Sequence, residues 1–131
     1  MTESGTFETD TLGTEHWAAI VLAAITGVVH LVLGVRGFPS AFGISFVLAG
    51  LGFFGAILLF LLNVRRRLLY LIGIPFTGIQ FVLYFVLNWP DVVAPAGIGD
   101  KVVQLLLIVL LIRLYRREED SETAPGAYAS Q

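Results

Sequence analysis

The chain has no cysteine and almost no charge inside its long apolar runs, and these two absences exclude several kinds of protein. Without cysteine there is no disulfide, no thiolate metal ligand and no cysteine nucleophile. Quinone-coupled thiol oxidation is therefore excluded. Charged residues make up only 14% of the 131 residues, well below the share typical of soluble domains. They are absent from Trp17–Gly34, Ala41–Leu62 and Leu68–Leu87.

These uncharged runs indicate membrane spans. Each comes close to the roughly 20 apolar residues that a helix needs to cross a hydrocarbon core of about 30 Å. The first run is not a cleavable signal peptide, because its leader "MTESGTFETDTLGTE" is acidic and lacks a basic segment. An exposed basic face of the kind that binds nucleic acid is also missing, so no nucleic-acid partner is expected. The sequence predicts an integral membrane protein.

The predicted fold class is all-α, a polytopic bundle of four transmembrane helices. The expected helices cover residues 15–36, 41–63, 67–88 and 98–116. Pro39 and Ser40 are well suited to opening the second helix. The fourth helix spans only if Lys101 lies at the surface and the Arg113 side chain reaches toward the interface.

The domain organisation follows from the same pattern. A polar acidic N-terminal tail is expected over residues 1–14, the four-helix domain over 15–117, and an acidic disordered tail over 118–131. The connection over residues 88–99 contains two prolines, which oppose a continuous helix there.

Basic residues predict the orientation. The side that holds both termini and the loop Arg65–Arg67 carries six basic residues, and the other side carries Arg36 and Lys101. The excess predicts a multi-pass protein of the cell membrane with both termini in the cytoplasm. Arg65, Arg66 and Arg67 are interpreted as a topology signal whose guanidinium groups contact the phosphates of anionic lipids.

Small residues recur on one face of each predicted helix. In lipid, such faces allow helices to approach closely. The candidate packing residues, at spacings that stay on one face of a helix, are Ala23, Gly27, Gly34, Ala49, Gly52, Ala56 and Gly73. These faces predict assembly into a homo-oligomer or with another membrane protein.

Polar residues of the predicted spans cluster toward the outer ends of the helices. At about 1.5 Å per residue, they lie at similar depths of roughly 6–10 Å below those ends. The candidate pocket residues are His30, Ser45, Gln80, Tyr84 and Gln104. Their common depth predicts a polar pocket or vestibule open to the outside.

His30 has two interpretations at this point. It is either a neutral imidazole hydrogen-bonded to Gln80, Gln104 or a backbone carbonyl, or a ligand contact or proton relay. His16 lies fourteen positions earlier on nearly the same face, a spacing that resembles paired haem ligands. Each haem would need a second axial ligand that only a dimer could supply, so no cofactor is expected.

Two functional hypotheses remain. No hydrolase elbow, phosphate loop or metal-ligand spacing is found, so catalysis is not expected. The first hypothesis is a non-enzymatic accessory or scaffold subunit that packs through its small-residue faces. The second is a small channel, transporter or lipophilic-ligand-binding protein that uses the pocket around His30.

Three segments together resemble a family of small, uncharacterised four-helix membrane proteins of halophilic archaea. These are "GISFVLAGLGFFGA", "RRRLLYLIGIPFTGIQFVLYFVLNW" and "DKVVQLLLIVLLI". The similarity covers about residues 15–117. It implies a four-helix fold and a halophilic source, with which the acidic ends and single lysine agree. Because the family has no known function, it supplies no site residues.

Overall fold

The computed structural model describes residues 12–123, which form four helices joined by short connections. The helices are α1 (Thr14–Gly37), α2 (Ala41–Leu61), α3 (Arg66–Asn88) and α4 (Pro95–Thr123). The prediction of an all-α helical bundle is confirmed. Three of the helices, α1, α2 and α3, are long and apolar enough to cross a membrane, whereas α4 carries charged residues near both of its ends.

The helix boundaries follow local chemistry. Gly13 precedes α1, and its N–H donates to His16 Nδ1 at 3.0 Å. Ser40 caps α2, as its sequence position predicted, by accepting a 3.1 Å hydrogen bond from the Gly43 N–H. The helix α3 continues through Pro75.

The fourth helix is longer than predicted at both ends. It begins at Pro95 rather than near residue 98, because proline has no N–H to lose at a first helical position. It continues to Thr123, so part of the predicted C-terminal tail is helical. Residues 1–11 and 124–131, which hold the rest of the predicted tails, lie outside the described residues.

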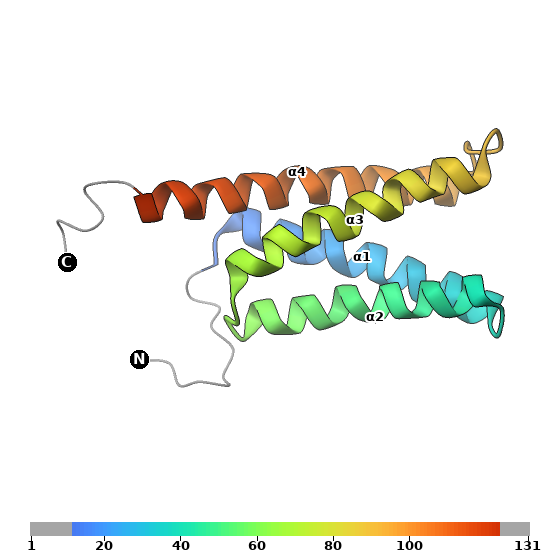
Figure 1. The fold of residues 1–131 in the computed structure, drawn as a ribbon, viewed down its shortest axis with the longest axis horizontal. Coiled ribbons are helices and arrows are strands. Elements are labelled where there is room, and N and C mark those ends of the chain that lie inside the picture. The colour runs from blue at the N-terminus through green and yellow to red at the C-terminus, as the bar shows by residue number, and fades with distance from the viewer. Residues whose placement is uncertain (1–11, 124–131) are drawn as a thin grey trace.

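Consecutive helices run in opposite directions, so both ends of the described chain lie at the same end of the bundle (Figure 1). We call this the arginine end, because the α2–α3 connection with Arg65 also lies there. The helix α1 packs against α2 and α4, and α3 packs against α4. By contrast, α2 and α3 have few close contacts and diverge from their connection (Figure 1).

The α1–α2 contact depends on glycines. A Cβ added at Gly34 would lie 2.6 Å from the Val47 backbone nitrogen, and one at Gly50 would lie 2.7 Å from Leu31 Cγ. The two helices can therefore approach this closely only with hydrogen at these positions. Near the arginine end, an apolar core completes the bundle, formed by Ala19, Phe53, Phe60, Tyr70, Leu107 and Leu114.

Candidate functional site

A closed ring of polar side chains joins α1 and α4 inside the bundle. The Thr26 hydroxyl donates to Asp100 Oδ1 at 2.7 Å. Asp100 Oδ2 lies 3.3 Å from Lys101 Nζ, which donates to Gln104 Oε1 at 2.5 Å. Gln104 Nε2 then donates back to Thr26 Oγ1 at 3.3 Å. We call these four residues the polar ring.

The polar ring is withdrawn from the surface. Thr26 and Gln104 are fully buried, and Asp100 and Lys101 are only 7% and 6% exposed to solvent. Burying a charge is costly unless it is paired and hydrogen-bonded. The ring meets this requirement, since its one carboxylate and its one ammonium face each other and each has a further polar partner.

Each helix supplies the ring at a similar depth. Asp100 and Gln104 are four residues apart, which places them on one face of α4. At about 1.5 Å per residue, they lie roughly 8 and 14 Å from the start of that helix. Thr26 lies on α1 eleven residues from its end at Gly37, which corresponds to roughly 16 Å.

His30 lies beside the ring and not within it. Its Nδ1 is 2.8 Å from the Thr26 carbonyl oxygen. A carbonyl can only accept, so the imidazole carries its proton on Nδ1 and donates. The imidazole of His30 packs against the rings of Phe46 and Phe53, with centroid distances of 5.0 and 5.7 Å. The backbone carbonyl predicted as one possible partner is thus the one the structure assigns.

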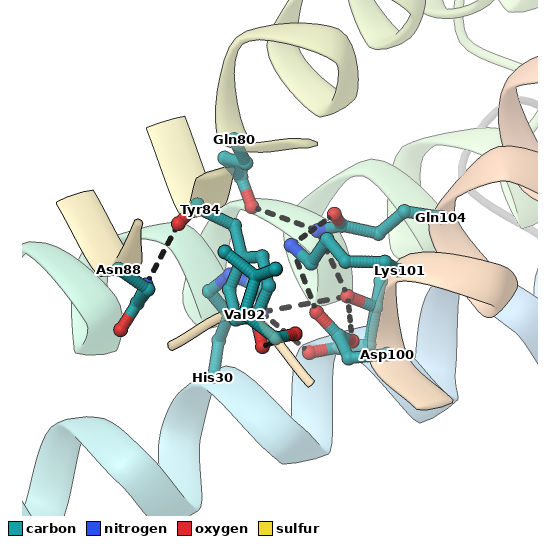
Figure 2. A network of polar contacts seen from close by, with 9 residues as sticks. His30, Gln80, Tyr84, Asn88, Val92, Asp100, Lys101 and Gln104 are labelled. Atoms are coloured by element: carbon teal, nitrogen blue, oxygen red, sulfur yellow. Dashed lines mark hydrogen bonds and ion pairs between the residues drawn. The ribbon is translucent and has the colours of Figure 1, made fainter. Parts of the chain in front are cut away.

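Gln80 and Tyr84 connect α3 to this site (Figure 2). Gln80 Oε1 accepts from Gln104 Nε2 at 3.4 Å. The Tyr84 ring lies over Lys101, with Nζ 5.0 Å from its centroid. The Tyr84 hydroxyl donates to the Val92 carbonyl at 2.8 Å. This hydrogen bond holds the α3–α4 connection against Tyr84.

The structure brings four of the five predicted pocket residues together: His30, Gln80, Tyr84 and Gln104. It does not bring Ser45 to them, because that side chain is exposed and donates to the Phe42 carbonyl of its own helix at 2.7 Å.

Three members of the site were missed from the sequence. Lys101 was expected at the surface, and that expectation is wrong, since it is buried against Asp100 and under Tyr84. Thr26 precedes His30 by four residues, a spacing that would have placed it on the same face. With the predicted start near residue 98, Asp100 and Lys101 lay in the first turn of the helix, and Asp100 was not named as a pocket residue. The actual start at Pro95 moves them inward.

Four of the predicted packing residues, all glycines, lie at contacts within the chain. Gly27 and Gly34 face α2, and a Cβ on Gly73 would lie 3.1 Å from Leu111. A Cβ on Gly52 would lie 3.0 Å from Phe76 of α3. Ala49 of α2 is half-buried. Ala23 and Ala56 line a cavity between the helices.

The arginine end is held by charged and aromatic contacts. Glu15 pairs with Arg113 at 2.5 Å and also with Arg117. The Arg66 guanidinium lies 4.7 Å from the Phe60 ring centroid, and that of Arg67 lies 5.2 Å from the Tyr115 centroid. Arg65 is exposed before the first turn of α3.

The two histidines are used in different ways. His16 accepts the Gly13 N–H at the start of α1 and stacks against Phe60 at 5.9 Å. No group of three or more histidine, aspartate or glutamate side chains is placed to hold a metal ion among the side chains that the structure describes. The arrangement therefore suggests capping for His16 and packing for His30.

The sequence pattern of a family of unknown function (DUF7475) matches residues 3–115. No curated protein and no solved structure matches the chain.

Proposed function

The chain belongs to this family of unknown function, and we propose that it is a non-enzymatic accessory or scaffold subunit of a membrane complex. In this role the bundle is a stable platform in the bilayer that packs against a second copy of itself or another membrane protein. The polar ring is then an internal lock and not a reaction site.

The observation that carries this proposal is the closure of the polar ring. Both N–H groups and the carbonyl of the Gln104 amide have partners among Thr26, Gln80 and Lys101. In lipid, hydrogen bonds of this kind join helices, because burial of apolar surface alone gains little there. A site whose donors and acceptors are already paired has little left to offer a substrate.

Gly55 is the position that supports a partner helix. It is exposed in the middle of α2, and a Cβ added there would have nothing within 4 Å. Glycine inside a helix costs about 0.5–1 kcal/mol relative to alanine. No contact within the described part of the chain offsets that cost. Close approach of another helix would do so.

The proposal includes the cell membrane as location and both termini in the cytoplasm. Arginine excess at the end of the bundle where α1 begins and α4 ends supports this orientation. It also includes a halophilic source and contacts with anionic lipids, for which the acidic termini and exposed Arg65 are the supporting features.

The test is native mass spectrometry of the protein extracted gently from its own membranes. We expect a complex larger than the monomer, and we expect Gly55→Leu to dissociate it, because the added side chain holds the helices apart. The matched control is Gly99→Leu, since Gly99 is also an exposed helical glycine with nothing within 4 Å. A monomer in the unaltered protein, or a complex that survives Gly55→Leu, would overturn the proposal.

The second candidate is a small channel, transporter or lipophilic-ligand-binding protein that works through the site around His30. One observation favours it: ionisable residues buried in a membrane bundle are functional candidates by default, and Asp100 and Lys101 are both buried. Under this hypothesis His30→Leu abolishes flux or ligand binding in proteoliposomes and leaves assembly intact.

A further inference from the structure

A cavity lies between the four helices, apart from the polar ring. Its volume is about 80 Å³, well above the roughly 10–15 Å³ that one water molecule needs. It extends from the level of His16 to that of Thr77, and the side chains around it are mostly apolar or aromatic. Three phenylalanines, Phe53, Phe60 and Phe76, contribute rings to its wall. The apolar and aromatic wall suits an apolar ligand.

Two residues that line this cavity have buried hydroxyl groups without a described partner. Tyr70 keeps 2% of its exposure and Thr77 keeps 1%. Among the side chains that the structure describes, neither the Tyr70 hydroxyl nor Thr77 Oγ1 has a hydrogen-bond partner. An unpaired buried hydroxyl costs about 1–3 kcal/mol. Such groups in a native protein call for an explanation.

The polar ring treats a buried hydroxyl differently. There, the hydroxyl of Thr26 is just as buried and both donates and accepts. The same bundle therefore pairs a threonine hydroxyl in one place and leaves another unpaired in a cavity. A group from outside the described chain is the simplest partner for Tyr70 and Thr77.

Part of the cavity wall belongs to exposed residues of α2. Gly52 and Ala56 line the cavity from this helix and are exposed. Both lie in an apolar helix long enough to span a membrane, so we expect this side of the cavity to face lipid. A molecule that reaches it arrives from the bilayer and not from water.

We propose that this cavity binds a lipophilic carbonyl compound with an apolar ring, the chemical class to which membrane quinones belong. Tyr70 and Thr77 are seven residues apart on α3, or about 10 Å along its axis. This rise separates their α-carbons, and it places the two side chains at different heights of the cavity. Two donors at different heights suit a ring that carries acceptor oxygens on opposite sides. The aromatic wall packs against the faces of the ring. The inference concerns binding alone and does not depend on the scaffold role.

The test compares two probes with the same carbon skeleton, of which only one carries carbonyl groups. Menadione and its parent hydrocarbon, methylnaphthalene, are titrated calorimetrically into the full-length protein in detergent, with protein-free micelles as the blank. We expect menadione to bind more tightly. Thr77→Val and Tyr70→Phe should each weaken menadione binding by about threefold to tenfold, the effect of one hydrogen bond. Neither variant should change the affinity for the hydrocarbon.

The same variants carry a second signature. Each removes an unpaired hydroxyl and keeps the side-chain shape, so the ligand-free protein should melt at a higher temperature. Ser45→Ala is the control, because that exposed hydroxyl lies outside the cavity. Its removal should change neither the menadione affinity nor the melting temperature. Equal affinity for the two probes would overturn the proposal. So would unchanged menadione affinity in both variants, or a lower melting temperature in both.

Discussion

The Thr26 hydroxyl donates a 2.7 Å hydrogen bond to Asp100 Oδ1 and thereby joins α1 to α4 across 74 positions of sequence. Thr26 Oγ1 also accepts from Gln104, so a single hydroxyl connects two residues of the polar ring. Both contacts are buried, where water cannot replace a lost partner. The stability of the bundle should therefore respond strongly to this one oxygen.

Thr26→Val tests this dependence. The variant keeps the shape of the side chain but leaves Asp100 Oδ1 and one Gln104 N–H without a partner. We expect a loss of about 1–3 kcal/mol in the free energy of unfolding. The measurement is unfolding in detergent followed by circular dichroism. Thr26→Ser restores the hydroxyl and should recover most of the loss, whereas a Thr26→Val protein as stable as the unaltered one would show that the ring contributes nothing.

Helical periodicity was sufficient to predict much of the site. His30, Gln80 and Gln104 were placed at one depth from their positions in three separate helices, and the structure brings them around one point. This worked because the spans are regular helices whose ends are marked by proline, serine and charge. Ser45 was misplaced because its exposed position on α2 faces away from α1, the helix against which α2 mainly packs.

The polar ring could not be predicted in full, because a charged residue near a helix end normally reaches the surface. Lys101 departs from this rule because three partners surround it: Asp100, Gln104 and the ring of Tyr84. Those contacts depend on how α3 and α4 pack, which no local pattern records. The unpaired hydroxyls of Tyr70 and Thr77 are likewise visible only once the helices are assembled.

Gly34→Ala should destabilise the α1–α2 pair. The new methyl group would lie 2.6 Å from the Val47 nitrogen, and a backbone atom cannot move aside as the end of a side chain can. We expect a loss of about 1–3 kcal/mol, the usual cost of overpacking, seen as a lower melting temperature. Gly99→Ala is the matched control: it meets nothing within 4 Å, so it should gain about 0.5–1 kcal/mol from helix propensity.

The proposed orientation can be tested cleanly because the chain has no native cysteine. Asp91→Cys lies in the exposed α3–α4 connection, and Val64→Cys lies in the exposed α2–α3 connection at the arginine end. We expect an impermeant maleimide to label residue 91 in intact cells and residue 64 only after permeabilisation. Labelling of residue 64 in intact cells would show that the orientation is the reverse of the proposed one.

Variants of the Asp100–Lys101 pair distinguish a structural role of this pair from a functional one. Asp100→Leu alone leaves a buried ammonium without its carboxylate, and Lys101→Met alone leaves a buried carboxylate without its ammonium. Breaking a buried pair in this way costs about 3–5 kcal/mol. Replacing both residues removes both charges, so the double variant should be more stable than either single variant, with a coupling measurable in a double-mutant cycle.

Assembly measured on the same variants shows which role the pair has. If it is only a lock, the double variant should keep the native complex, since its bundle stays intact. If the pair serves transport, the double variant should be stable and assembled but inactive in a flux assay. Strictly additive losses would instead show that the two charges do not stabilise each other. The 3.3 Å contact between Asp100 Oδ2 and Lys101 Nζ would then have no energetic consequence.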